Sequence, residues 1–164
     1  MLKQQTIKKS VQLSGVGLHT GHPVVLTLQP ASVGTGIVFR RVDLQPKVDI
    51  KVRWDTVVRT NYATVVANDQ GVEVSTIEHL MAALSAYAIY NLIIEIDGPE
   101  VPIMDGSAAP FLFLLECAGL QRISSEQPFI KILQEMRVDT EDGRCAVISP
   151  TQDEALTISI DFAL

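Results

Sequence analysis

Residues 76–97 read TIEHLMAALSAYAIYNLIIEID, and the hydrophobic period changes once within them. Positions 77, 80, 81, 84 and 88 are apolar and spaced by three or four, which predicts an amphipathic helix from about Thr76 to Tyr87. The segment NLIIEID (91–97) is rich in Ile and Leu, which is typical of a buried strand. The stretch therefore predicts a core helix that returns directly into a core strand.

The flanking sequence extends this pattern into an α+β fold. A turn-bearing segment, GPEVPIMDG (98–106), leads to a second predicted helix, with Ser107 as N-cap candidate and Gly119 as its end. Several strands in succession, then helix, strand and helix, predict a two-layer sandwich with helices on one face of a mixed or antiparallel sheet. The strands expected before the first helix are TIKKSVQL (6–13), VVLTL (24–28), GIVFRR (36–41), VDIKVRW (48–54), ATVVA (63–67) and VEV (72–74).

The sequence after the second helix predicts a different unit. QRISSEQP (121–128) is polar and ends in proline, which is typical of a linker after a first domain at 1–120. Three strands are expected beyond this linker and no helix, so about forty residues would lack a core of their own. We expect residues 129–164 to be the opening strands of a second, incomplete domain of similar type.

Composition excludes some functional classes. The 164 residues carry a net charge of −6 and are 47% hydrophobic. An acidic chain lacks the basic face that a general nucleic-acid binder needs, so no nucleic-acid partner is expected. The longest apolar stretch, residues 80–96, is interrupted by Ser85 and Asn91 and changes period, which favours core elements and no transmembrane segment.

The adjacent Glu78 and His79 allow two interpretations. Ser75 and Glu78 match the capping box S-x-x-E, in which the glutamate closes the first turn of the helix. Alternatively, His79 is a ligand of a catalytic zinc and Glu78 is the base that takes a proton from water. The H-E-x-x-H pattern is absent, so two ligands must come from elsewhere. His19 and His22, three apart in a glycine-rich stretch, could ligate, but a solvated loop is the more common outcome for such a pair.

Three motifs in the same order closely resemble the UDP-3-O-acyl-N-acetylglucosamine deacetylase family, the zinc enzymes of an early step in bacterial lipid A synthesis. The motifs are GVGLHTG (15–21), TIEHLMAAL (76–84) and PEVPIMDGSAAPF (99–111), and VFRRVDL (38–44) fits as well. The resemblance covers the whole chain. It implies two similar α+β domains with the active site between them, a zinc cofactor and a UDP-3-O-acyl-N-acetylglucosamine substrate.

The resemblance also implies roles for individual residues. Glu78 would be the catalytic base and His79 a zinc ligand. The stretch 60–63 would line the entrance for the sugar and acyl chain, although it carries Asn61-Tyr62-Ala63 where many members have Met-Leu-Cys. The substrate-binding residues that the resemblance implies are His19, Thr60, Tyr62, Arg144, Asp161 and Phe162, with Arg144 facing the diphosphate and Phe162 stacking on uracil.

The remaining zinc ligands of the family are expected in the second domain, beyond Leu164. We therefore expect the 164-residue chain alone to be inactive, since a catalytic zinc site needs about three protein ligands. A non-catalytic UDP-sugar-binding fragment and an inert structural fragment are the alternatives. Cys117 and Cys145 lie far apart and form no CxxC pattern, which indicates reduced thiols in a cytoplasmic protein. We expect the full-length protein to be a monomer, with at most peripheral contact with the inner membrane through its acylated substrate or product.

Overall fold

The computed structural model describes residues 3–152 and 156–160. The chain separates into two compact units, Met1–Gln127 and Pro128–Leu164. The elements of the first unit are β1 (Lys3–Ile7), β2 (Val11–Val16), β3 (Pro23–Pro30), β4 (Ile37–Arg41), β5 (Val48–Lys51), the 3₁₀ turn η1 (Trp54–Thr56), β6 (Val57–Arg59), β7 (Val65–Ala67), β8 (Glu73–Val74), α1 (Glu78–Ala86), β9 (Leu92–Ile96), α2 (Ala109–Ala118) and β10 (Leu120–Glu126). The second unit contains β11 (Met136–Asp139) and β12 (Cys145–Ile148).

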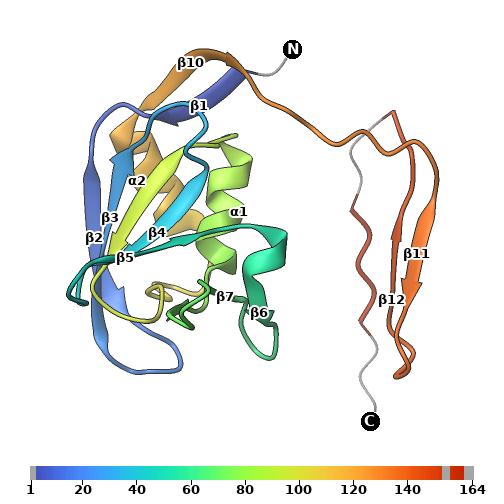
Figure 1. Ribbon diagram of the computed structural model, residues 1–164, viewed down its shortest axis with the longest axis horizontal. Coiled ribbons are helices and arrows are strands. Elements are labelled where there is room, and N and C mark those ends of the chain that lie inside the picture. Colours follow the sequence, from blue (N-terminus) through green and yellow to red (C-terminus); the bar gives the residue numbers. More distant parts are fainter. Residues whose placement is uncertain (1–2, 153–155, 161–164) are drawn as a thin grey trace. The chain divides into compact units, whose positions relative to one another are not determined.

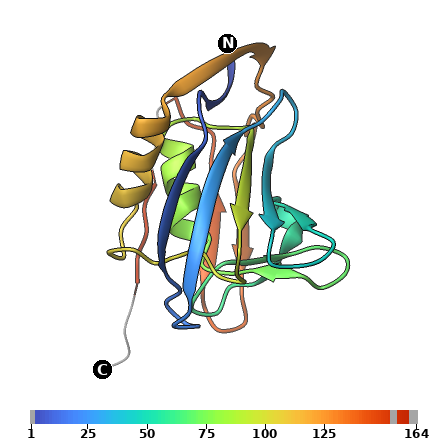
Figure 2. The same cartoon turned by 90° about the vertical axis from the view of Figure 1, so that its left-hand side faces the viewer.

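A five-stranded sheet in the order β2-β3-β9-β4-β5 forms one layer of the first unit. Strand β4 pairs with β9 in parallel, and the other neighbours are antiparallel, so the sheet is mixed. Helices α1 and α2 form the second layer and cover one face of this sheet (Figures 1 and 2). The predicted α+β sandwich is confirmed.

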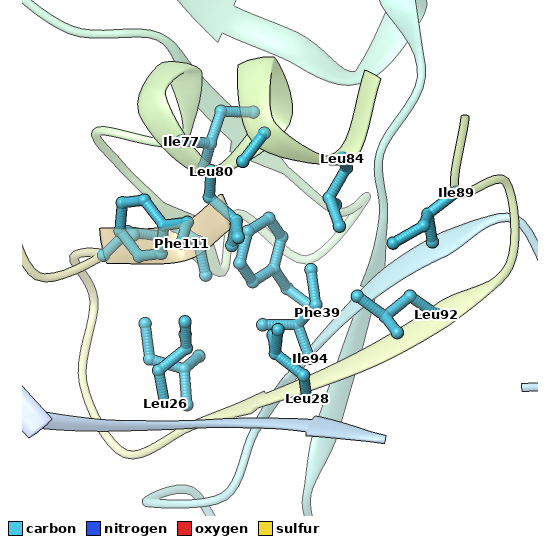
Figure 3. Packing of buried hydrophobic residues seen from close by; sticks show 14 of the residues in the cluster. Leu26, Leu28, Phe39, Ile77, Leu80, Leu84, Ile89, Leu92, Ile94 and Phe111 are labelled. Atoms are coloured by element: carbon cyan, nitrogen blue, oxygen red, sulfur yellow. The ribbon is translucent and has the colours of Figure 1, made fainter. Parts of the chain in front are cut away.

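The core lies between the sheet and the helices, because alternate residues of each strand point to the same face. Leu26 and Leu28 of β3 pair with Ile96 and Ile94 of β9, and all four side chains are fully buried. Figure 3 shows strand side chains pointing toward Leu80 and other residues of the helical layer. Burying each such side chain contributes about 1.5–3 kcal/mol, so this layer contact holds α1 firmly in place.

The opposite face of the sheet is polar at the alternate positions. Gln29 donates to Glu95 across β3 and β9 at 2.6 Å, and Arg40 makes a bidentate ion pair with Asp49 across β4 and β5 at 2.7 and 2.9 Å. These cross-strand pairs occupy the non-core side, which explains why the central strands alternate in polarity.

Both predicted helices are present, with boundaries that differ slightly from expectation. Helix α1 begins two residues after Thr76 and is followed by Ala88 in the left-handed region, at φ 49°. Helix α2 ends at Gly119 with φ 68°, which confirms the predicted stop. Its N-cap is Ala108, one residue after the expected Ser107, whose Oγ accepts the N–H of Ala109 at 3.1 Å.

A small sheet, β6-β7-β8, is joined to the central sheet through β4. The buried Arg41 at the end of β4 makes this attachment: its Nη1 donates to the backbone oxygen of Glu73 in β8 at 2.9 Å. The same guanidinium is bidentate to Asp43, at 2.8 and 2.7 Å. This contact is relevant to α1 because β7 and β8 belong to the same small sheet, and Thr64, next to β7, is hydrogen-bonded to the first turn of α1.

The structure differs from the expected linker at 121–128. Residues 120–126 are strand β10, which pairs antiparallel with β1, so that Ile7 faces Leu120. The polar side chains of this segment are compatible with a strand as well as with a linker. A strand with one solvated face needs few apolar residues when its backbone is hydrogen-bonded to a neighbouring strand. The partner, β1, lies more than a hundred residues away in the sequence.

The second unit is a hairpin of β11 and β12, which pair from Met136 with Ile148 to Asp139 with Cys145. The loop between them is closed by the N–H of Arg144 donating to the Thr140 hydroxyl, with Gly143 at φ 84°. Two of the three strands expected here are present. The third was expected at 156–162: residues 156–160 pair with no described segment and form no strand, and residues 161–162 lie outside the described residues.

Candidate active site

Glu78 and His79 occupy the first turn of α1, and the structure excludes the capping-box interpretation. The N-cap is the buried Ile77, and no side chain caps the helix. Ser75 lies in a parallel bridge to Glu100 instead, and its hydroxyl donates to the Pro99 oxygen at 3.2 Å. Because Ser75 pairs with this distant segment, α1 begins at Glu78. Glu78 is thus the first residue of the helix, and not the third after an N-cap at Ser75.

The Glu78 carboxylate is held from the side by the segment before β7. Its Oε2 accepts the N–H of Thr64 at 2.9 Å, and the Thr64 oxygen in turn accepts the N–H of Ile77 at 3.4 Å. Oε1 has no hydrogen bond within the described ranges 3–152 and 156–160. A carboxylate at a helix N-terminus also interacts favourably with the helix dipole. One carboxylate oxygen is thus fixed by the backbone, and no described residue engages the other.

His79 is half-buried next to Glu78 on the same turn. Its imidazole makes no hydrogen bond or ion pair to any described residue. An imidazole without a protein partner fits one position of a zinc site, since neutral imidazole nitrogen is a preferred zinc ligand. Within residues 3–152 and 156–160, no group of three His, Cys, Asp or Glu side chains gathers to complete such a site. The described residues around His79 thus offer this one imidazole and no complete set of zinc ligands.

The β6–β7 loop, residues 60–63, lies directly before Thr64 and so borders Glu78. Thr60 and Tyr62 are exposed, and Tyr62 is 94% exposed with φ 62°. A left-handed backbone is uncommon for a large side chain, and here it turns the Tyr62 ring into solvent. The structure thus places Thr60 and Tyr62 in the exposed loop that leads to Thr64, whose N–H donates to Glu78.

His19 lies in the β2–β3 loop, and its side chain is exposed. Its backbone N–H donates to Oε1 of Glu100 at 3.0 Å, and the next amide, of Thr20, donates to Oε2 at 2.8 Å. Thr76, two residues before Glu78, donates its hydroxyl to the same carboxylate at 2.9 Å. The His19 loop and the start of α1 are therefore joined through Glu100.

Sequence reasoning missed Thr64 and Glu100 as parts of this site. Thr64 acts through its backbone, so its side chain carries no signal. Glu100 lies in PEVPIMDG (99–106), which turn chemistry alone explains. The proline-flanked carboxylate was the available signal, but its burial, at 2% exposure, becomes visible only in the folded chain.

The other expected substrate contacts fall in the second unit. Arg144 is exposed and forms an ion pair with Asp142 at 2.6 Å. Its guanidinium and the Thr140 hydroxyl lower the pKa of Asp142 to about 2, so that carboxylate is charged at neutral pH. Asp161 and Phe162 lie outside the described residues.

Comparison with known proteins identifies the family. The family model described as LpxC, UDP-3-O-acyl N-acetylglycosamine deacetylase, matches residues 4–164. The chain belongs to the LpxC family. Three curated relatives, each named UDP-3-O-acyl-N-acetylglucosamine deacetylase, are similar along 99% of the chain: those of Aliivibrio fischeri (46% identical), Sodalis glossinidius (46%) and Blochmanniella pennsylvanica (48%).

The chain spans about half the length of these LpxC relatives: 53% of the Aliivibrio fischeri and Sodalis glossinidius proteins and 54% of the Blochmanniella pennsylvanica protein. Among the described residues, no helix is both long and apolar enough to cross a membrane. The matched half of the relatives contains the Glu78–His79 turn and the His19 loop.

Proposed function

We propose that this chain supplies the general base and one zinc ligand of a deacetylase that removes the N-acetyl group from UDP-3-O-acyl-N-acetylglucosamine. The observation that carries the proposal is the asymmetry of the first turn of α1. Glu78 has one oxygen anchored on Thr64 and one oxygen unengaged, while the adjacent His79 has no protein partner within the described ranges. Membership in the LpxC family supports the same assignment.

The geometry suits Glu78 to accept a proton from water. The anchored Oε2 fixes the carboxylate, so that Oε1 presents a lone pair in one direction without reorganisation. A zinc ion held by His79 and by ligands outside the described part would act as a Lewis acid and lower the pKa of a water molecule. Glu78 would take a proton from the attacking water as the water adds to the amide carbonyl. Return of a proton to the nitrogen would let the C–N bond break and release acetate and the sugar amine.

The core behind the turn keeps these groups in place. Leu80 and Leu84, on the buried side of α1, are 0% and 1% exposed. A first turn backed by a packed helix loses little freedom on substrate binding, which is the condition for pre-organised catalysis.

Substrate contacts depend on the placement of the loops. His19 and the loop residues Thr60 and Tyr62 would contact the sugar and the acyl chain at the edge of the Glu78 site. Arg144 would face the diphosphate, and Asp161 and Phe162 would contact the uridine. We also propose that the protein acts in the cytoplasm, and that residues 129–164 open a second domain completed by sequence like that in the other half of the relatives.

A chimaera tests the proposal. This chain would replace the matching 162 residues of the Aliivibrio fischeri relative, and acetate release from UDP-3-O-acyl-N-acetylglucosamine would be measured with added zinc. We expect activity from the unaltered chimaera and a loss of at least about 100-fold in kcat for Glu78→Gln, since a positioned base contributes about 10²–10⁴-fold. His79→Ala should in addition weaken zinc binding, measured by equilibrium dialysis. Full turnover in both variants would refute the assignment.

The 164-residue chain alone provides the second arm of the test. We expect no deacetylation above the buffer control at any zinc concentration, because His79 is a single ligand and a catalytic zinc site needs about three. Calorimetry with UDP separates the remaining alternatives: measurable binding favours a nucleotide-binding fragment, and its absence favours a chain that contributes only structure until its second half is present.

A further inference from the structure

Glu100 is a buried carboxylate that no ion pair neutralises among the described residues. It is 2% exposed and lies four residues after the end of β9. Its two oxygens accept three hydrogen bonds, from the amides of His19 and Thr20 and from the hydroxyl of Thr76, at 3.0, 2.8 and 2.9 Å. Burial without a cation is unfavourable for a carboxylate, so these donors determine whether the local structure forms.

The three donors come from two segments that are distant in sequence. His19 and Thr20 belong to the β2–β3 loop, about 80 residues before Glu100, whereas Thr76 leads into α1. The backbone around Glu100 is itself fixed to the second segment. The amide of Ser75 donates to the Pro99 oxygen at 2.9 Å, and the amide of Val101 donates to the Ser75 oxygen at 3.1 Å.

Two backbone features show that the surroundings are shaped to this carboxylate. Gly17 is buried, and a Cβ at that position would overlap both the Glu100 carboxylate and the Thr20 hydroxyl. Thr76 holds a left-handed φ of 57°, which is strained for a β-branched residue and directs its hydroxyl to Glu100. Close approach at Gly17 and strain at Thr76 both serve the same three hydrogen bonds.

We propose that Glu100 is a positioning residue that holds the His19 loop against the segment leading into Glu78 and His79. The inference rests on the proposed function, because it concerns how two parts of that active site are kept in register. Glu100 does not contact the reacting atoms. It acts through Thr76, two residues before the base, and through the backbone of His19.

The first test uses the 164-residue chain itself and needs no activity. Amide hydrogen exchange would be measured at His19 and Thr20 in the unaltered chain and in Glu100→Gln. The glutamine amide group must turn an N–H₂ toward one of the two backbone donors, so we expect exchange at His19 or Thr20 to accelerate at least tenfold. Asn91→Asp is the matched control: Asn91 is also buried and anchors a loop, through Gly36, but lies at the other end of β9.

The second test uses the chimaera with the Aliivibrio fischeri half. We expect Glu100→Gln to lower kcat at least tenfold, whereas Asn91→Asp stays within about twofold at a comparable loss of stability, because small misplacements at an active site have large effects on rate. Thr76→Val should lower kcat as well, and Thr76→Ser, which keeps the hydroxyl, should restore it. The double variant of Glu100→Gln and Thr76→Val should be no slower than the worse single variant, as expected for two residues acting through one bond.

The outcomes are separable. If Glu100→Gln leaves His19 and Thr20 exchange unchanged, or if its kcat falls no further than that of Asn91→Asp, Glu100 has no positioning role, even when Glu78→Gln abolishes activity as proposed. If Glu78→Gln remains fully active, the proposed function fails. The exchange measurement then still decides whether Glu100 holds the His19 loop.

Discussion

The backbone N–H of Thr64 lies 2.9 Å from Oε2 of Glu78, and this contact, not a helix cap, orients the carboxylate at the start of α1. The two carboxylate oxygens of Glu78 therefore differ. Oε2 is engaged by the backbone, and Oε1 makes no hydrogen bond within the described ranges. The structural contribution of the Thr64 contact can be measured by comparing two substitutions of Glu78, because glutamine keeps an oxygen acceptor and alanine does not.

Replacing Glu78 should therefore have different effects on stability and on activity. We expect Glu78→Ala to lower the free energy of unfolding by about 1 kcal/mol, because the Thr64 N–H loses its acceptor. Glu78→Gln should change it by less than half of that while still abolishing activity in the chimaera. Urea denaturation of the 164-residue chain measures the first effect. Equal destabilisation by the two variants would contradict the role assigned to Oε2.

We expect the two neighbouring arginines of β4 to contribute unequally to the free energy of unfolding. Arg41 is 8% exposed and ties β4 to β8, so we expect Arg41→Met to lower the free energy of unfolding by about 1–3 kcal/mol. Amides of β7 and β8 should exchange faster in this variant, because the small sheet loses its attachment. Arg40→Met removes a similar bidentate pair, with Asp49, on the solvated face.

The Arg40 substitution serves as the control, with an expected cost of about 0–1 kcal/mol because exposed ion pairs contribute little. If the two variants unfold at the same urea concentration, Arg41 does not couple the two sheets in the way the structure indicates.

Two phenylalanines of α2 distinguish the core-facing side of the helix from the other side. Phe111 is fully buried and Phe113 is 67% exposed. We expect Phe111→Ala to lower the free energy of unfolding by about 3–5 kcal/mol, and Phe113→Ala to change it by no more than about 0.5 kcal/mol. Thermal or urea unfolding followed by circular dichroism measures both. If Phe111→Ala does not fold, Phe111→Leu should fold with a smaller loss.

Acid should weaken the contact between the His19 loop and α1. Burial raises the pKa of Glu100, but the hydrogen bonds from the amides of His19 and Thr20 and from the hydroxyl of Thr76 outweigh it, so the pKa falls below its ordinary 4.5. A lowered pKa means that the unfolded chain binds the proton first. The stability that this carboxylate contributes is thus complete above about pH 4.5 and is lost as the pH falls further, through the folded-state pKa.

The measurement compares urea midpoints of the unaltered chain and of Glu100→Gln between about pH 7 and about pH 3. The difference between the two proteins should shrink as the pH drops, because the unaltered carboxyl becomes neutral. A constant difference across the whole range would show that ionisation of Glu100 does not stabilise the fold.

Local sequence patterns predicted much of the framework. The apolar spacing in 76–88 and the Ile-rich run in 91–97 identified α1 and β9, and Gly119 marked the end of α2. These features depend on residues within one or two turns of each other. They can therefore be recognised in any sequence with the same hydrophobic period. The α+β layers follow from the order of the elements.

Long-range pairing produced the differences. Residues 120–126 form a strand and not a linker because β1 supplies a backbone partner. Ser75 does not cap α1 because it pairs with the segment 99–101. In both cases a local preference competed with hydrogen bonds to a distant segment. The distant bonds prevailed because buried backbone groups must be satisfied.

The sequence by itself determined the two layers, the motif pair Glu78–His79 and the family to which the chain belongs. Only the tertiary structure decided which oxygen of Glu78 is engaged and which donors satisfy Glu100. The physical reason is that hydrophobic periodicity is a property of neighbours along the chain. The partner of a buried polar group is instead chosen by which distant segments the packed core brings within hydrogen-bonding distance.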